Sequence, residues 1–409
     1  MRLVPFEEAL AHVLRGAERL GVEEVALEDA DRRVLAEDLE ALRPMPEHDQ
    51  SAMDGYALRL ADLEGDGPFA LAVEGESRAG GRPPALPVGH ACRIFTGATV
   101  PDGADVVVMQ ERVRFESERL VLVARPAPRQ NIRARGEDLA EGAVVLRAGT
   151  RLRPSTLGLA AALDRPRVRV ARRPRIALLG TGDELRAPGT AHRPGSLPES
   201  NAYVVGALAR RAGAAVRVCP FAVDEPAALE QAMAGALEDA DVLVTIGGAS
   251  VGDHDLVRPT LERLGVVFDF AGVSMRPGKP TASGRLGGQR VLCLPGNPAS
   301  ATLAFHLLGV PLVRALQGDD APHPSTATLP VLGTHRRHLG ANCDGRDDFL
   351  RARLELRGGV THARLAPKQS SGAVTSFAEA DVLVRLSGLR DRIDEGDILP
   401  TLRLSELEG

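Results

Sequence analysis

The spacing of hydrophobic and polar positions changes along the chain, and each pattern predicts a different kind of structure. Between residues 3 and 42, apolar positions recur at helical spacing through Leu20 and again from Val34 to Leu42, which predicts helices. From about 46 to 145, and again from 325 to 409, short apolar runs are separated by turn residues, as in small β-rich domains. The sequence therefore predicts a helical N-terminal segment and two β-rich domains.

The region between the two β-rich parts, residues 175–318, has a third pattern. Apolar runs of strand length alternate here with helical segments of about 10–18 residues, which predicts a parallel sheet with both faces covered by helices. The expected strands are Arg175–Leu179, Val216–Cys219, Asp241–Ile246 and Val291–Leu294. The expected helices are Ala202–Arg211, Pro226–Leu237, Leu256–Leu264 and Pro298–Leu316. We expect four parts, namely 1–45 together with 147–174, 46–146, 175–318 and 325–409.

Composition narrows the class of protein. The 409 residues are 44% hydrophobic and 26% charged, which is ordinary for a folded chain. A net charge of -5 and the absence of tryptophan give no support to nucleic-acid or membrane-surface binding. The longest apolar stretch, Ala301–Val313, is shorter than the ~20 residues of a membrane span, and the N-terminus lacks a signal-peptide pattern. Four scattered cysteines form no CxxC pair, which suits a reducing compartment. From these observations together we expect a cytoplasmic protein without nucleic-acid or membrane partners.

A basic run, Arg165–Arg175, holds six arginines and two prolines. Such a run could bind a polyanion. Val168 and Val170, however, alternate with the arginines, as in a strand with one exposed face. A solvated strand or linker is therefore the favoured interpretation.

Glycine-containing turns follow three of the expected strands, at Leu178–Leu185, Thr245–Gly252 and Leu294–Ser300. Ligands of parallel α/β sheets bind beyond the carboxyl ends of the strands, and glycines let backbone N–H groups approach an anion. Asn297 is a good N-cap residue and Pro298 a good first residue for the helix that follows. Together the three turns predict an oxyanion or phosphate site.

Two common nucleotide motifs are absent. Gly180-Thr181-Gly182 lacks the third glycine of the dinucleotide fingerprint. Gly278-Lys279-Pro280 has proline where a P-loop needs serine or threonine to bind Mg²⁺. The chain is therefore neither a dinucleotide-binding protein of that type nor a P-loop ATPase.

Charged residues follow the same strands. Carboxylates beside a phosphate would repel it unless a hard cation bridges them, and Mg²⁺ commonly combines one or two carboxylates with substrate phosphates. Arg276 and Lys279 add positive charge, and Lys279 is one of only two lysines in the chain. The acids are Asp183, Glu184, Asp224, Asp253 and Asp255.

Eight separate motifs carry a resemblance to the molybdopterin molybdenumtransferase family, to which the C-terminal part of gephyrin also belongs. They extend over essentially the whole chain and occur in the order of the family. The motifs are Ser51–Ala57, Phe95–Gly97, Asn131–Arg133 with Gly136–Asp138, Gly180–Leu185, Ser200–Asn201, Gly247–Gly252, Pro277–Pro280 and Leu294–Pro298.

The resemblance implies a reaction and an architecture. Enzymes of this family ligate molybdate to adenylylated molybdopterin and release AMP, with Mg²⁺ as the cofactor. The resemblance also implies an elongated homodimer with active sites at the subunit interface. The 175–318 domain is expected to be related to the molybdopterin adenylyltransferases, and such an adenylyltransferase is a further expected partner.

The family's functional residues map onto this sequence motif by motif. Those with expected catalytic roles are Asp54, Thr96, Asp138, Glu184, Asp224, Asp255 and Lys279. The expected metal ligands are Glu184, Asp224 and Asp255. The expected substrate-binding residues are Gly247, Gly248, Ser250, Gly252, Arg276, Pro295, Asn297, Pro298, Arg346 and Ser371.

Two other functions stay open at this point. A molybdopterin adenylyltransferase would share the 175–318 domain, although the flanking β domains and the helical N-terminus argue against it. A non-catalytic scaffold of the gephyrin type is the other alternative, and a chain without a linker or partner domain argues against that. This chain also has Gly272 where some relatives carry lysine, so Arg276 and Lys279 are expected to provide more of the molybdate binding.

Overall fold

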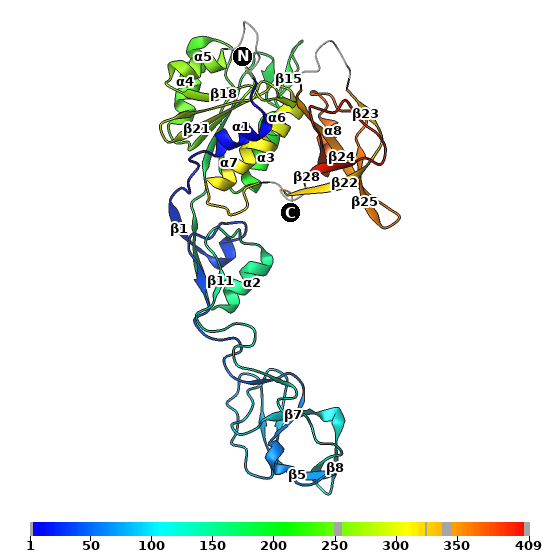
Figure 1. Ribbon diagram of the computed structural model, residues 1–409. Helices are drawn as coiled ribbons and strands as arrows, with labels where there is room; N and C mark the ends of the chain where they lie inside the picture. The colour runs from blue at the N-terminus through cyan, green and yellow to red at the C-terminus, as the bar shows by residue number, and fades with distance from the viewer. Residues whose placement is uncertain (1–2, 249–255, 324, 338–344, 405–409) are drawn as a thin grey trace. The chain divides into compact units, whose positions relative to one another are not determined.

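The computed structural model describes residues 3–248, 256–323, 325–337 and 345–404. Two compact units divide the chain, and each is described by itself (Figure 1). Unit 1 comprises Met1–Ala36, Gly149–Arg153 and Arg167–Gly409, and unit 2 comprises Glu37–Ala148 and Pro154–Pro166. Unit 2 is therefore inserted into the sequence of unit 1.

A six-stranded sheet forms the centre of unit 1. Four of its strands are parallel, as predicted, and their carboxyl ends meet at one edge. The other two are antiparallel, so the sheet is mixed rather than fully parallel. The short Gly287-Gly288 turn, a common hairpin signal, makes this reversal possible. The strand order is β16 (Ala215–Val218), β13 (Arg175–Gly180), β17 (Val242–Ile246), β21 (Gln289–Leu294), β20 (Ala282–Leu286) and β18 (Val267–Ala271).

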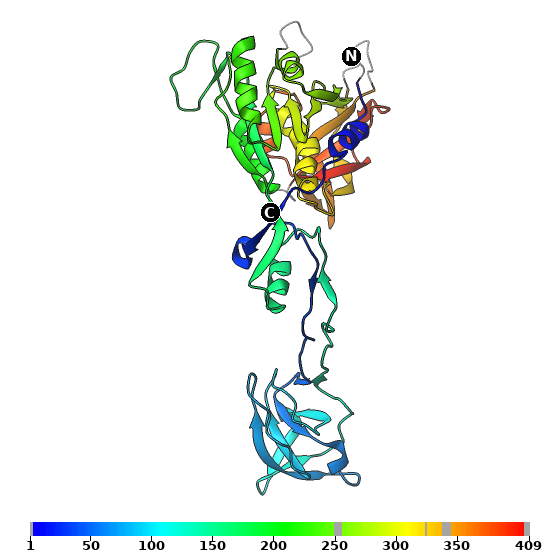
Figure 2. The same ribbon diagram turned by 90° about the vertical axis from the view of Figure 1, so that its left-hand side faces the viewer.

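Helices cover both faces of this sheet (Figures 1 and 2). One face packs against α1 (Phe6–Leu14), α3 (Asn201–Arg211), α6 (Pro298–Ala304) and α7 (Val310–Ala315). The other packs against α4 (Pro226–Leu237) and α5 (Val257–Arg263). The predicted helices of this region are confirmed, except that a π-helix, Phe305–Gly309, separates α6 from α7. Pro311 has no N–H to donate within the helix, which favours such an irregularity.

The C-terminal part of unit 1 forms a second, barrel-like sheet. Its strands β24, β25, β22, β28 and β26 pair in a closed cycle, and the short β19 joins β24 at one side. Phe349 and Leu383 of this sheet also pack into the core beneath α1. The bounds are β19 (Met275–Arg276), β22 (Thr326–Leu332), β24 (Asp347–Arg357), β25 (Val360–Leu365), β26 (Val382–Leu386), β28 (Ile398–Arg403) and the short helix α8 (Thr375–Ala378).

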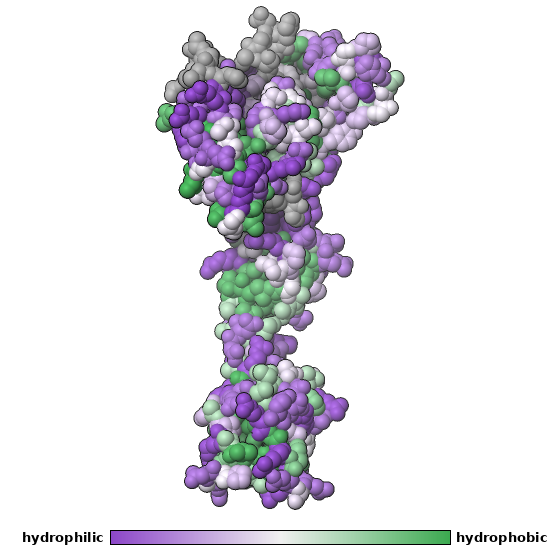
Figure 3. Space-filling model, turned by 90° about the vertical axis from the view of Figure 1, so that its right-hand side faces the viewer, coloured by the Kyte–Doolittle hydropathy of each residue, from purple (hydrophilic) through white to green (hydrophobic). Residues whose placement is uncertain are grey.

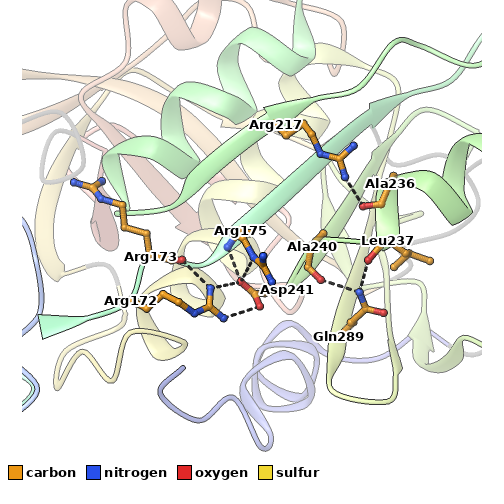
Figure 4. A network of polar contacts seen from close by, with 9 residues as sticks. All are labelled: Arg172, Arg173, Arg175, Arg217, Ala236, Leu237, Ala240, Asp241 and Gln289. Atoms are coloured by element: carbon orange, nitrogen blue, oxygen red, sulfur yellow. Dashed lines mark hydrogen bonds and ion pairs between the residues drawn. The ribbon is translucent and has the colours of Figure 1, made fainter. Parts of the chain in front are cut away.

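The arginine run lies in a strand, as favoured from the sequence. β12 (Arg167–Ala171) pairs with β1 (Val22–Ala26), and the side chains of Val168 and Val170 are buried while the arginines between them are exposed. Its last arginines bind the amino-terminal end of the central sheet (Figure 4). Asp241, directly before β17, accepts hydrogen bonds from the Arg172 guanidinium at 2.8 and 2.9 Å.

Unit 2 is built around another six-stranded sheet with a core of leucine and valine side chains. The predicted β-rich character of residues 46–145 is confirmed. The order is β7 (Val106–Met109), β4 (Gly55–Leu58), β6 (His90–Ile94), β5 (Phe69–Ser77), β9 (Arg119–Leu122) and β8 (Val113–Glu116). The remaining elements are α2 (Pro154–Ala162) and the strand pairs β2 (Leu39–Glu40) with β11 (Val144–Leu146) and β3 (Gln50–Ser51) with β10 (Ile132–Arg133).

The prediction of helix from Val34 to Leu42 is wrong. Val34 and Leu35 are fully buried, but their backbones bridge to Arg151 and Val170 instead of continuing a helix. A short apolar run has the same spacing in a buried extended segment as in one helical turn, and long-range pairing decides between them.

Hydrophilic side chains cover most of the face drawn in Figure 3, with smaller hydrophobic areas between them. Within the described ranges, no helix has the length and apolar character to cross a membrane.

Candidate active site

The predicted turns converge at the carboxyl ends of the parallel strands in unit 1. Thr181 donates its N–H to the Ile246 carbonyl oxygen at 2.9 Å, and Gly247 donates its N–H to that of Leu294 at 3.1 Å. The turns after β13, β17 and β21 are thus hydrogen-bonded to one another in sequence. We call this set of turns, residues 180–182, 246–248 and 294–298, the cradle.

Two glycines of the cradle have no room for a side chain. A Cβ atom on Gly247 would lie 2.5 Å from the backbone oxygen of Thr181, and the backbone φ of +98° also disfavours other residues. A Cβ atom on Gly248 would lie 2.2 Å from Val257. Beside them, the Thr181 hydroxyl is buried and has no hydrogen-bond partner among the described residues. The two glycines therefore let the turns of the cradle pack closely on one another, and the buried hydroxyl beside them is the polar atom that a ligand would satisfy.

The helix that follows the cradle begins where predicted, but the side chain of Asn297 does not cap it. Asn297 is the N-cap and Pro298 occupies the first helical turn, yet the Asn297 side chain makes no capping hydrogen bond. The backbone carbonyl oxygen of Asn297 accepts hydrogen bonds from the N–H groups of Ser300 and Ala301 instead. Asn201 of α3 donates its amide to the Gly296 oxygen at 2.7 Å, so α3 is joined to the same turn.

Carboxylates gather beside the cradle. Asp183 accepts the Asp224 N–H at 3.1 Å. Burial, and then the neighbouring charges of Asp183 and Glu184, raise the pKa of Asp224 above its usual value. Three carboxyl groups that repel one another suit a hard cation, because oxygen ligands neutralise such repulsion on binding it. No group of three or more acidic, histidine or cysteine side chains with metal-binding geometry occurs within the described residues, and Asp255 lies outside them.

The predicted cations come from the segment that joins the two sheets of unit 1. Arg276 lies opposite Asp348 in the β19–β24 pairing, and its Nε atom is 3.8 Å from the Asp348 carboxylate. The same carboxylate, which is 2% exposed, accepts a hydrogen bond from Arg337 at 2.9 Å. Lys279 is held through its backbone, whose oxygen accepts the Val273 N–H at 2.9 Å. The Lys279 side chain is partly exposed.

Ser371 lies close to the cradle, on a loop that a buried arginine holds. The backbone oxygen of Ser371 accepts a hydrogen bond at 3.0 Å from the N–H of Ala299, which lies in the first turn of α6. Arg351 is fully buried and donates hydrogen bonds to the Ser376 hydroxyl at 3.1 Å and to the Ser370 oxygen at 3.1 Å. The loop that carries Ser371 is thus fixed by the C-terminal sheet.

Unit 2 contributes a second, separate group of predicted residues. The Asp54 carboxylate accepts two hydrogen bonds from Thr96, from its N–H at 2.8 Å and from its hydroxyl at 2.9 Å. These bonds lower the pKa of Asp54, so the carboxylate is ionised near neutral pH. The residue is also exposed to solvent. Asp138 lines a cavity of about 710 Å³ together with Gly97 and Arg133.

Comparison with known proteins explains why these features occur together. Family models match three ranges: "MoeA N-terminal region (domain I and II)" matches 4–163, "Probable molybdopterin binding domain" matches 177–315, and "MoeA C-terminal region (domain IV)" matches 342–404. A molybdopterin molybdenumtransferase of Nostoc sp. is 35% identical over 366 residues, which cover 87% of this chain and 83% of the relative. The chain belongs to the molybdopterin molybdenumtransferase family.

Other relatives agree with this assignment over nearly the full length. The molybdopterin molybdenumtransferase of Haemophilus influenzae is 34% identical over 390 residues, 94% of each chain. The solved structure of a molybdopterin biosynthesis moea protein from Pyrococcus horikosii has a TM-score of 0.81 at 30% identity and covers 98% of this chain and 99% of its own. The family consists of enzymes, and the predicted multidomain fold, with its α/β and barrel-like parts, is confirmed.

In this molybdopterin molybdenumtransferase family member, the structure places most of the predicted site residues in local groups. Gly247, Gly248, Pro295, Asn297 and Pro298 form the cradle. Glu184 and Asp224 lie together, Asp54 and Thr96 lie together, and Arg276 lies on the strand beside the one that carries Asp348. Ser250, Gly252 and Asp255 are outside the described residues, as are Ala249 and Asp253.

Several residues beside these groups were missed by the sequence analysis. Thr181 was quoted only as part of a turn, and its buried hydroxyl is evident only after folding. Asp348 follows the predicted Arg346 by two positions, the spacing of side chains on one face of a strand, which was the available signal. Arg93 of unit 2 lies over the rings of Tyr56 and Phe95 at 5.0 and 4.8 Å and donates to the Gly55 oxygen at 3.1 Å, next to Asp54.

Proposed function

We propose that this chain ligates molybdate to the dithiolene of adenylylated molybdopterin and releases AMP. The observation that supports this proposal most is the cradle, in which three turns meet at the carboxyl ends of the parallel strands and Gly247 and Gly248 pack closely against the buried Thr181. Backbone N–H groups in such turns bind tetrahedral anions, a class that includes both phosphate and molybdate. The names of the relatives suggest a molybdopterin substrate. We propose that its anionic group binds in the cradle.

The cations next to the cradle suit molybdate, a tetrahedral dianion. Arg276 carries a planar guanidinium that can bind two oxygens at once, and Asp348 restricts its orientation. Lys279 supplies a compact charge from a turn between two prolines. No nucleophilic side chain is needed, because the oxygens of molybdate are exchanged for the sulfurs of the substrate itself.

Mg²⁺ is the cofactor that we propose for this reaction. Its fit rests on the chemistry of the donor set, because Asp183, Glu184 and Asp224 bring carboxylate oxygens together, with the Asp224 N–H 3.1 Å from the Asp183 carboxylate. Glu184 and Asp224, with Asp255, would hold the ion, and the ion would neutralise charge on the phosphoryl oxygens of the leaving AMP. The chain's own backbone N–H groups and cations would bind the anions and orient them.

The direct test combines adenylylated molybdopterin, molybdate and Mg²⁺ and measures both AMP and molybdenum cofactor. We expect both products to appear in equal amounts, and only when molybdate is present. The variant Asp224→Asn should lose most of the Mg²⁺-dependent release, whereas Asp239→Asn, which changes an exposed acid after α4, should retain it. Formation of adenylylated molybdopterin from ATP, without cofactor formation, would instead indicate an adenylyltransferase.

We also propose a homodimer in which Asp54 and Thr96 of one subunit complete the site of the other. Asp54 is ionised, exposed and oriented by two hydrogen bonds, as expected of a residue that acts on a ligand. Mixing Asp54→Ala chains with Asp255→Ala chains should restore part of the activity, because one of the two sites in each heterodimer is then intact. Heterodimers that are confirmed by mass and remain inactive would exclude a shared site.

A further inference from the structure

An apolar cavity of about 400 Å³ lies between α3, α6 and the C-terminal sheet, and none of the functions above uses it. α3 packs beside α6 on the same face of the central sheet (Figure 1). Tyr203 and Ala207 of α3 line one wall, and Thr302 and His306 line the opposite wall. Phe377 of α8 closes the side toward the C-terminal sheet. We call it the α3–α6 cavity.

One buried polar side chain faces this cavity. His306 is 1% exposed, and neither ring nitrogen has a hydrogen-bond partner in the part of the chain that the structure describes. Burial, and then the charge of Arg314, lower the pKa of His306 to about 4, so the ring is neutral. The Arg403 backbone lies near the ring and opposes this shift, but it does not meet the geometry of a hydrogen bond. A neutral imidazole offers one N–H donor and one nitrogen acceptor. Both are unused here, which is costly for a buried group unless a ligand satisfies them.

The backbone at His306 is irregular as well. His306 is the second residue of the π-helix Phe305–Gly309, and Pro311 follows two residues after its end. A π-helical turn widens the helix and turns its side chains, and such turns occur frequently at functional sites. The irregular turn thus places the unpartnered ring on the wall of the cavity.

The α3–α6 cavity adjoins the cradle through two residues. Asn201 and Pro298 line the cavity, while Asn201 also binds the Gly296 oxygen and Pro298 directly follows the Asn297 cap. This adjacency is what would let a molecule whose phosphate lies in the cradle reach the α3–α6 cavity. The part that enters must be largely apolar and flat-sided, since the described lining contains two aromatic rings and no acidic side chain.

We propose that the α3–α6 cavity binds the fused nitrogen heterocycle of a phosphate-bearing substrate, with His306 hydrogen-bonded to a polar atom on the edge of the ring. The inference deepens the proposed function, on which it rests, because adenylylated molybdopterin carries two such rings, a purine and a pterin. Both share this chemistry, and the experiment below separates them. Tyr203 is 65% exposed, as expected of a residue at the entrance that covers a ring only when one is bound.

The test uses the full chain, with AMP and 6-hydroxymethylpterin as separate probes. The ring C–H signals of the ten histidines are recorded by NMR, and the signal of His306 is assigned as the one that is missing in His306→Leu. Ala207→Phe and Ala378→Phe fill the cavity from exposed positions, so neither disturbs the core. Ala234→Phe makes the same change at an exposed position of α4 and is the control.

We expect one probe to shift the His306 signal in the wild type and in Ala234→Phe. Its affinity should fall about tenfold or more in Ala207→Phe and Ala378→Phe, because the phenyl ring takes the place of the apolar contacts. A response to AMP alone assigns the cavity to the purine, and a response to the pterin alone assigns it to the pterin. His306→Leu should bind the probe more weakly yet melt at or above the wild-type temperature, since it removes buried polar atoms without partners. A merely structural histidine would show the opposite change in stability.

Three results would overturn the proposal. The first is that neither probe shifts the His306 signal. The second is that Ala207→Phe keeps the wild-type KM for adenylylated molybdopterin while the enzyme turns over, which leaves the proposed function intact. The third is that Ala207→Phe changes the oligomeric state, because the groove would then be covered by a second copy of the chain. Failure of AMP release in the wild type, with the His306 shift present, would contradict the proposed reaction and not the cavity.

Discussion

Each end of the central sheet holds an aspartate, the half-buried Asp241 at the amino-terminal end and the exposed Asp224 at the carboxyl end, and their surroundings shift the two pKa values in opposite directions. At the amino-terminal end, burial alone would raise the pKa of Asp241, but hydrogen bonds from Arg172 and from the Arg175 N–H lower it below its usual value. At the carboxyl end, burial raises the pKa of Asp224, and Asp183 and Glu184 raise it further. Arginine partners stabilise the ionised form of the first aspartate, whereas like charges destabilise the ionised form of the second.

This difference shows which end contributes to stability and which to function. Gln289 and Arg217 add hydrogen bonds to backbone oxygens near Asp241 (Figure 4), at 2.8 Å to Ala240 and 3.0 Å to Ala236. The cradle end instead contains an unpartnered buried hydroxyl and glycines that cannot accept a side chain. Polar groups without partners cost free energy in the empty protein, and a ligand recovers it.

The largest effect is expected at Gly247, where the backbone itself is shaped for the site. Gly247→Ala should lower the free energy of unfolding by about 3 kcal/mol, because its Cβ meets the Thr181 oxygen and its φ is positive. Urea unfolding measures this. Gly235→Ala is the control, since a Cβ on this residue of α4 meets nothing within 4 Å, and it should stabilise by about 0.5–1 kcal/mol. Equal effects at the two glycines would show that the cradle is not tight.

A smaller loss is expected at the satisfied end. Asp241→Asn should cost about 2 kcal/mol, because hydrogen bonds to a charged acceptor are lost. Since folding lowers the pKa of Asp241, its contribution is present above the unfolded pKa of ~3.9 and disappears as the pH falls through the lower folded value. The difference in unfolding free energy between wild type and variant should therefore be constant near neutral pH and shrink in acid. A difference that persists at the lowest pH would contradict the charge-based account.

At the cradle end the sign should reverse. Asp224→Asn should change the unfolding free energy by less than about 0.5 kcal/mol, and toward greater stability, because it relieves repulsion from Asp183 and Glu184. Folding raises the pKa of Asp224, so its ionisation is unfavourable above the folded pKa, and the gain should disappear as the pH falls below ~3.9. Added Mg²⁺ should stabilise the wild type more than the variant. If Mg²⁺ raises both melting temperatures equally, these acids do not hold it.

The smallest change in stability is expected at Lys279. Lys279→Arg keeps the charge and should leave the melting temperature near that of the wild type, since a partly exposed cation contributes little. It should nevertheless raise the half-saturating molybdate concentration, because the larger planar group does not fit a site for a compact charge. Arg276→Lys should be tolerated better. Identical molybdate titrations for wild type and Lys279→Arg would show that Lys279 does not touch molybdate.

The sequence predicted local features well where one pattern had one physical cause. The four expected strands and four expected helices of residues 175–318 are confirmed, as are the turns at the carboxyl ends as far as they are described, because apolar periodicity and glycine-rich turns are local signals. The helix at Val34–Leu42 is wrong because pairing with distant residues decided it. Asp348 and His306 were missed for a related reason. Their surroundings come from other strands and helices, and no spacing along the chain reveals a buried atom without a partner.

The insertion of unit 2 into unit 1 also has a consequence for the order of events on the ribosome. Unit 2 is contained in residues 37–166 apart from one short return, so it can fold as soon as that stretch has emerged. α1, although synthesised first, packs against strands made much later, and Glu7 pairs with Arg385, 378 positions further along. At about 5–20 residues per second, the apolar face of α1 waits on the order of tens of seconds for the sheet that covers it. We therefore expect the nascent N-terminus to be the segment that most needs a chaperone, and unit 1 to fold only after the last strands are released.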